Sequence, residues 1–228
     1  MTPEAACLIG YSPRPETLVT INDHTTLLVC GMGAERAKRA ARQLIDVGAE
    51  RLVSCGTAGA TSADLEPGDL IIPETIAATG GQIYPTASQW RSSTVNRLSD
   101  CPCSIYLGQL ADSMHVLTTA ADKWSLQQEI GSQAVDMESA AIAGIAAKHE
   151  IPYIVIRAIS DSSKMMIPDA VIAVSDAYGR IRVTRLIKML ATRPGQIPQL
   201  IQLATGFMAA AKTLKWIGRR LEQVLGNE

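Results

Sequence analysis

A nearly continuous apolar segment occurs at Tyr153-Ile154-Val155-Ile156-Arg157-Ala158-Ile159. Such a run, rich in β-branched residues, is typical of a strand that is covered on both faces. Shorter strand-like runs precede it at 5–10, 26–30, 51–55, 70–72, 104–110 and 115–118, and helical patterns lie between them at 34–47, 121–130 and 138–150. This alternation predicts an α/β fold, a single domain with a mixed, mainly parallel central sheet flanked by helices.

The composition supports a globular protein. The chain has 228 residues, of which 47% are hydrophobic, so global disorder is excluded. It carries 21 Lys+Arg and 22 Asp+Glu, and this balance argues against a dedicated nucleic-acid binder. The charge is uneven, however: residues 1–179 hold 12 basic and 20 acidic side chains, whereas residues 180–228 hold 9 and 2.

The basic end of the chain has a helical pattern of its own. We therefore expect an α/β domain over 1–165 and an amphipathic, basic C-terminal helical extension over 166–228. Its apolar positions, three and four residues apart, are Leu200, Leu203, Phe207, Ala210, Leu214, Ile217, Leu221 and Val224. They form a seam along a helix of roughly 28 residues. The helix either packs on its own domain or on a dimer partner, or it lies on an anionic membrane surface.

The cysteines and the first residues bear on location. The five Cys are odd in number and scattered, and no basic and apolar leader is seen at Met1, so a reduced cytoplasm is expected. Cys101-Pro102-Cys103 lacks a second ligand pair at zinc spacing, and no metal site is expected. No uncharged apolar run reaches the roughly 18 residues of a membrane-spanning helix.

A glycine turn, Gly31-Met32-Gly33, separates the expected strand at 26–30 from the helix that begins near Ala34. A strand, a glycine turn and a helix N-terminus together form an anion-accepting site. The turn fails as a dinucleotide fingerprint because Arg36 occupies the third glycine position. Tight packing of strand and helix, without a ligand, is the alternative.

A second run of small residues, Ser54-Cys55-Gly56-Thr57-Ala58-Gly59-Ala60, follows the strand expected at 51–55. Small side chains let a ligand approach the backbone at the carboxyl edge of the sheet, where open α/β sheets bind substrates. The hydroxyl of Thr57 can face an anion or a sugar there. Close packing of the backbone explains the same residues equally well.

Two carboxylates, Glu138 and Asp161, are candidate catalytic or substrate-binding groups. Glu138 opens an Ala-rich helix, where it either complements the helix dipole or accepts hydrogen bonds from vicinal hydroxyls such as those of a ribose. Asp161 follows the apolar strand. A half-buried carboxyl there can have a raised pKa and act as a general acid, or it can cap the next segment.

Four motifs fall in order over about residues 5–165: Gly31-x-Gly33, Gly56-Thr57-Ala58-Gly59, Val135-Asp136-Met137-Glu138-Ser139 and Arg157-Ala158-Ile159-Ser160-Asp161. Together they resemble the purine nucleoside phosphorylase and nucleosidase family. The resemblance implies that Glu138 holds the ribose hydroxyls while Met137 packs on the sugar. It implies that Asp161, with Ser160 beside it, protonates purine N7 as the glycosidic bond breaks. Trp124, in the segment 121–124, resembles the aromatic that stacks on the base.

The family divides between phosphate and water as the attacking group. Its phosphorylases carry an Arg at the place of Ser54, which favours a nucleosidase here. Arg14, in contrast, resembles a phosphate-binding Arg, and Glu16 is the acid nearest to the place of a water-activating Glu. Hydrolysis is the preferred interpretation, and inorganic phosphate as a co-substrate stays open. The candidate residues for the phosphate or nucleophile site are Arg14, Glu16, Gly31 and Gly33. No other cofactor is implied.

The end of the chain, from the segment 166–170 through 190–198 to the amphipathic helix, resembles the hopanoid-associated phosphorylases, also described as adenosylhopane nucleosidases. This implies release of adenine from adenosylhopane, a nucleoside with an apolar hopane tail, by a cytoplasmic homo-oligomer that contacts the inner face of the membrane. The alternatives are a methylthioadenosine or adenosylhomocysteine nucleosidase, a purine nucleoside phosphorylase, and a nucleoside-binding module without turnover.

Overall fold

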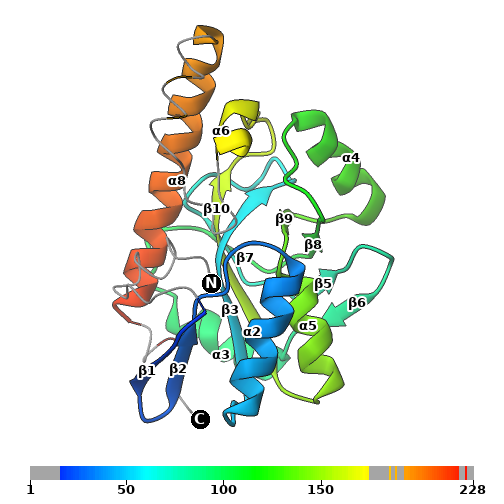
Figure 1. Cartoon of the computed structure of the whole chain (residues 1–228), viewed down its shortest axis with the longest axis vertical. Coiled ribbons are helices and arrows are strands. Elements are labelled where there is room, and N and C mark those ends of the chain that lie inside the picture. The colour runs from blue at the N-terminus through cyan, green and yellow to red at the C-terminus, as the bar shows by residue number, and fades with distance from the viewer. Residues whose placement is uncertain (1–15, 175–184, 186–187, 189–192, 221–223, 225–228) are drawn as a thin grey trace.

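The computed structural model describes residues 16–174, 185, 188, 193–220 and 224. Its centre is an eight-stranded sheet in the order β6-β5-β8-β9-β3-β10-β4-β7 (Figure 1). Four of the neighbouring pairs are parallel and three are antiparallel, so the mixed, mainly parallel sheet is confirmed. The strands are β3 (Leu52–Ala60), β4 (Leu70–Ile71), β5 (Thr75–Ala77), β6 (Ile83–Pro85), β7 (Ile105–Tyr106), β8 (Leu110–Asp112), β9 (Ala134–Asp136) and β10 (Tyr153–Asp161).

Helices cover both faces of the sheet. On one face, α2 (Ala34–Asp46) and α5 (Ser139–Lys148) pack against each other and share an apolar core with β3 and β10. On the other face, α8 (Ile197–Gly218) packs on β10, and the end of α3 (Ser88–Arg97) joins the same cluster through Leu98. Figure 1 shows these two layers on opposite sides of the sheet, with α4 (Ala120–Ile130) and α6 (Asp169–Val174) beyond its carboxyl edge.

Several expected elements differ in extent from the observed ones. The strand expected at 51–55 continues to Ala60, so Gly56 and Thr57 lie inside β3 and not in a loop after it. Its small residues form a strand because they pair in parallel with β10, which tertiary contact can impose against local preference. The segment 115–118 is irregular, 104–110 divides into β7 and β8, and the strand expected at 5–10 lies outside the described residues.

The chain near residues 18–28 forms a separate hairpin. β1 (Leu18–Asn22) and β2 (Thr25–Leu28) pair with each other in a two-stranded antiparallel sheet. The strand expected at 26–30 is therefore present but belongs to the hairpin and not to the central sheet. The local sequence pattern predicts a strand here but not which sheet it joins, because an apolar strand can belong to either sheet.

The two halves of helix α8 have different surroundings. In its second half, Ala210, Leu214 and Ile217 are fully buried and pack with the core residues of β10, so this half packs on the domain itself. Its first half reaches past the sheet beside α6 (Figure 1). The segment 197–211 holds no charged residue, and the basic residues Lys212, Lys215, Arg219 and Arg220 all follow it. No helix in the described part of the chain is long and apolar enough to cross a bilayer.

Gly206 allows α8 to approach β10 closely. A Cβ at this position would overlap the carbonyl oxygen of Ser160. We therefore expect Gly206→Ala to lower the free energy of unfolding by about 1–3 kcal/mol, as overpacking does. Gly195→Ala is the matched control, because a Cβ there meets nothing within 4 Å. Urea unfolding measures both, and equal stability of the two variants would contradict the close contact.

Candidate active site

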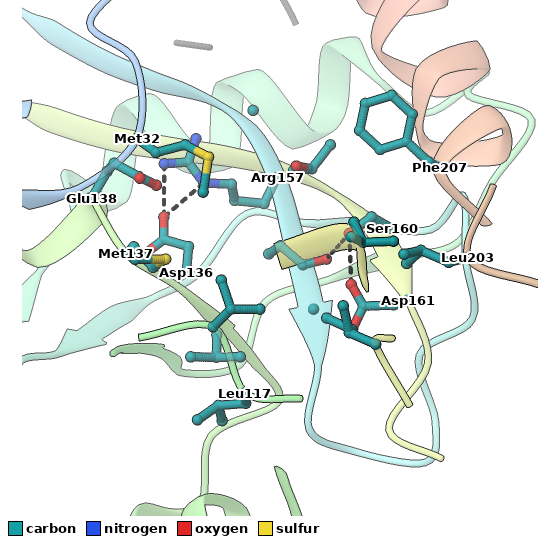
Figure 2. A pocket seen from close by; sticks show the side chains of 18 of the residues that line it. Met32, Leu117, Asp136, Met137, Glu138, Arg157, Ser160, Asp161, Leu203 and Phe207 are labelled. Atoms are coloured by element: carbon teal, nitrogen blue, oxygen red, sulfur yellow. Dashed lines mark hydrogen bonds and ion pairs between the residues drawn. The ribbon is translucent and has the colours of Figure 1, made fainter. Parts of the chain in front are cut away.

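A cavity of about 700 Å³ opens along the carboxyl ends of β3 and β10. Its polar lining comes from the sheet and α5, and includes Glu138, Arg157 and Asp161. Its apolar lining comes from the segment 116–117, from α6 and from the first half of α8. In Figure 2, Glu138 and Met137 lie at one end, while Asp161 and Ser160 lie at the other, on the side of Leu203 and Phe207.

The side chain of Glu138 is fixed by the glycine turn. The residue immediately precedes α5, and the amide N–H of Gly33 donates to its Oε1 at 2.7 Å. The turn thus does present a donor at the N-terminus of α2, but this donor already binds a carboxylate of the protein. Burial, and then the nearby carboxylate of Asp136, raise the pKa of Glu138. Its second oxygen, Oε2, has no hydrogen bond among the described residues that line the cavity.

Behind Glu138 lies a buried polar network centred on Arg157. The guanidinium donates from Nε to Asp136 Oδ2 at 2.7 Å and from Nη2 to Ser54 Oγ at 2.7 Å. It also reaches Ser139 Oγ at 3.1 Å. Burial opposes the charged guanidinium, but the carboxylates of Asp136 and Glu138 outweigh it and raise the pKa of Arg157. The network holds a permanent positive charge beneath the carboxylate end of the cavity.

The glycines of β3 make room for the charged side chains of β10. Gly56 pairs with Arg157, and a Cβ at Gly56 would lie 3.1 Å from Arg157 Nη1. Gly59 pairs with Asp161, and a Cβ there would lie 2.8 Å from Asp161 Oδ2. An irregularity between Ile159 and Asp161 sets this register, as bulges often do beside functional sites. The small residues of β3 therefore leave the space that the charged side chains of β10 occupy.

Asp161 is buried and accepts hydrogen bonds at both oxygens. Ser160 Oγ donates to Oδ1 at 2.7 Å, and the ammonium of Lys123 donates to Oδ2. Lys123 is fully buried at the start of α4 and pairs with Asp161 as a salt bridge. This pair could not be predicted from the sequence, because the two residues are 38 positions apart and belong to different elements.

The structure gathers most, though not all, of the predicted site residues. Glu138, Asp161, Met137, Ser160, Gly31, Gly56 and Thr57 all line the cavity. Trp124 does not line it and is 61% exposed. Consecutive residues of a helix point about 100° apart, so α4 directs Lys123 inward and its neighbour Trp124 away. Glu16 is exposed and outside the lining, and Arg14 lies outside the described residues.

The described residues were searched for metal ligands and for further polar groups near the cavity. They contain no cluster of three or more His, Cys, Asp or Glu side chains that could hold a metal ion. Cys101 Sγ and Cys103 Sγ approach to 2.7 Å, but neither lines the cavity. His115, which the sequence analysis did not single out, does line it.

Solved structures share this architecture. The futalosine hydrolase of Helicobacter pylori superposes with a TM-score of 0.68 at 14% identity, covering 97% of this chain and 93% of that one. A 5′-methylthioadenosine/S-adenosylhomocysteine nucleosidase from Neisseria meningitidis, in complex with methylthio-immucillin-A, superposes with a TM-score of 0.66 at 17% identity, covering 94% of each chain. At these identities the likeness concerns the fold.

The sequence comparisons add family evidence. A guanosine phosphorylase from Halorubrum lacusprofundi is 28% identical over 138 residues, which cover 54% of this chain and 56% of that protein, so the match spans little more than half of each. The sequence pattern of the phosphorylase superfamily matches residues 14–112 and 86–188, well over half of the chain. The protein therefore belongs to the phosphorylase superfamily.

Proposed function

We propose that the protein cleaves the N-glycosidic bond of a purine nucleoside with an apolar substituent, and that it releases adenine from adenosylhopane during hopanoid synthesis. One observation carries this proposal. A single cavity joins two differently held carboxyl groups, Glu138 and Asp161, to an apolar wall supplied by α6 and α8. The alternative, a nucleoside-binding module, has no need of a buried acid coupled to a cation.

The ribose is held at the Glu138 end. One oxygen of Glu138 is fixed by Gly33, which leaves the other to accept hydrogen bonds from vicinal hydroxyls. Met137 lies beside it in the lining and packs against the sugar. The positive charge of Arg157 beneath the site keeps two neighbouring carboxylates, Asp136 and Glu138, compatible with each other.

The purine is bound at the Asp161 end. Asp161 hydrogen-bonds N7 and passes it a proton as the bond from the sugar to N9 breaks. A protonated base leaves more readily, and the sugar becomes oxocarbenium-like. Ser160 orients the carboxyl through its 2.7 Å hydrogen bond, and Gly56 and Thr57 form the wall of β3 beside the bound nucleoside.

Water is the attacking group in this proposal. A phosphate site needs cations that are free to pair with the phosphate oxygens. Of the described residues that line the cavity, the two Lys and Arg side chains are Lys123 and Arg157, and both already pair with carboxylates. Ser54, which stands where the phosphorylases carry an Arg, accepts a hydrogen bond from Arg157.

The apolar wall supports a nucleoside that carries a hydrocarbon tail. One side of the cavity is apolar and is formed by Leu200, Leu203, Phe207 and Met208 of α8 with Ile167 and Ile172. Burying such side chains against a hydrocarbon is favourable by about 25 cal/mol per Å² of apolar surface. A small thioether nucleoside would leave most of this surface without a partner, which favours adenosylhopane over methylthioadenosine.

The test is to incubate the protein with adenosylhopane, methylthioadenosine and adenosine in turn, with and without inorganic phosphate, and to quantify free adenine. We expect the highest kcat/KM for adenosylhopane and no change on adding phosphate. Adenine release only with phosphate would overturn hydrolysis. Preference for methylthioadenosine would support the alternative nucleosidase, and binding without adenine release would support the binding module.

A substitution on α8 tests the apolar wall. Leu203→Ala is expected to lower kcat/KM for adenosylhopane roughly tenfold, because an apolar contact worth about 1.4 kcal/mol is lost. Adenosine, which lacks the tail, should be turned over as before. Leu107→Ala is the matched control, because its side chain is 39% exposed and does not line the cavity. Equal losses for both substrates would remove Leu203 from the tail site.

We propose further that the chain is cytoplasmic and touches the inner face of the membrane through the first half of α8. Ile197 and Ile201 are exposed there in a segment free of charge, beside the mouth that a lipid-like substrate would enter. Ile201→Glu should lower flotation with phosphatidylcholine–phosphatidylglycerol vesicles roughly tenfold, since a buried Ile contributes about 1.5–3 kcal/mol. Val47→Glu, at an exposed position on α2's end, is the control. Equal flotation of both variants would refute the contact.

A further inference from the structure

We propose that Lys123 supplies the proton that Asp161 passes to the departing purine, so that the two residues act as a proton relay. This inference rests on the proposed glycosidic cleavage and assigns it one more residue. It starts from the most unusual side chain in the cavity, a lysine that is 1% exposed. Lys is almost never fully buried unless it is paired, so this position calls for an explanation.

Every N–H group of the Lys123 ammonium has a hydrogen-bond acceptor. Its ammonium has three N–H groups, and three acceptors surround it: Asp161 Oδ2, the carbonyl of Ser162 at 2.8 Å and the carbonyl of Met165 at 3.3 Å. Two neutral carbonyls and one carboxylate thus hold the ammonium against the acid. Because Lys123 also lines the cavity, the pair is in place before a substrate enters.

The same geometry places a hydrogen-bond donor against each oxygen of Asp161. Ser160 donates to one oxygen and Lys123 to the other, so both oxygens act as acceptors. A purine N7 is an acceptor as well, and two acceptors cannot bond without a proton between them. The ammonium is the group in direct contact that carries a surplus of protons. In the proposed relay the proton reaches N7 through Asp161 and comes from Lys123.

The relay moves one proton from Lys123 to the departing purine. The bond between C1′ and N9 breaks and its electron pair stays with the purine. N7 takes a proton from the Asp161 carboxyl, which takes one from the ammonium of Lys123 and leaves a neutral amine. Water attacks C1′, forms the new C–O bond and releases one proton, and Lys123 recovers a proton from solvent. One water is consumed, and the net proton count is unchanged.

The leaving group distinguishes a relay from a structural ion pair. Adenine needs a proton to depart, whereas 4-nitrophenolate leaves without one. Lys123→Met should therefore lower kcat/KM for adenosylhopane by about 10²–10⁴-fold, the usual contribution of acid catalysis. The same variant should lose less than about tenfold on 4-nitrophenyl β-D-ribofuranoside. Lys123→Arg should behave in the same way, because a guanidinium keeps the charge but does not give up its proton.

The controls separate this proposal from the proposed function. Lys164→Met removes an equal charge from an exposed position on the loop after β10 and should leave both rates unchanged. Lys123→Gln, which retains an N–H donor, replaces the Met variant if the latter loses the native melting transition. Equal losses on both substrates, or full activity of Lys123→Arg, would overturn the relay. A wild-type protein that cleaves neither substrate would instead refute the glycosidic activity itself.

Discussion

The Asp161→Asn variant is expected to release adenine from adenosylhopane about 10³ times more slowly than the wild type, within the range of about 10²–10⁴ for a lost general acid. An amide is nearly the same size as the carboxyl and still accepts a hydrogen bond from Ser160. It cannot, however, receive a proton from Lys123 and pass it to N7. The loss should therefore appear in kcat, with KM changed little, because binding contacts to the base persist.

The measurement is single-turnover adenine release together with a thermal melt. Removing the carboxylate leaves Lys123 buried without its counter-charge, so stability must be measured alongside activity. Asp100→Asn makes the same chemical change at an exposed position after α3 and should retain both activity and melting temperature. An Asp161→Asn protein that melts normally and keeps full activity would remove Asp161 from the reaction.

The second large effect is on stability. Arg157→Met should lower the free energy of unfolding by about 3–5 kcal/mol, the usual result of breaking a buried ion pair. Arg157 and Asp136 are both buried, and methionine would leave the Asp136 carboxylate without its 2.7 Å partner. For a protein of this size the melting temperature should fall by roughly 6–20 °C. Urea unfolding and calorimetry measure the two quantities.

Two further variants show whether the lost charge is the cause. Lys38→Met removes a cation from a solvent-exposed pair with Glu35 and should leave the free energy of unfolding nearly unchanged. Adding Asp136→Asn to Arg157→Met should recover part of the loss, because the orphaned carboxylate is then neutral. If the double variant is as unstable as the sum of the single ones, the two residues do not act as a pair.

The fold could be predicted largely because its central strand is so apolar. The run at 153–159 forms β10, which lies inside the sheet between β3 and β4. The helices expected at 34–47, 121–130 and 138–150 are observed with ends within two residues. Short strands such as β5, β6 and β9 were missed. Each has three residues and is held by its neighbours rather than by a local pattern.

The site could be predicted only in part, for a related reason. Glu138 was predicted because it opens an Ala-rich helix that is clear in the sequence. Asp161 was predicted because it follows the apolar strand at 153–159. Lys123 was missed in favour of Trp124, since a single sequence does not show which of two adjacent helical residues faces inward. The contribution of α8 to the cavity was also out of reach, because it depends on how the helix packs on β10 through Gly206.

The pairing of β3 with β10 has a consequence for how the protein forms during synthesis. Leu52 pairs with Tyr153, so the central strands meet only after a long intervening stretch has been made. Contacts between residues so distant in the chain close slowly, and folding rates fall as such contacts dominate. Until β10 leaves the ribosome, the emerging chain exposes β3 with an unpaired edge, where association with other chains is favoured. The last residues of α8 cover one face of the sheet, so the native core is completed only after Ile217 has left the ribosome.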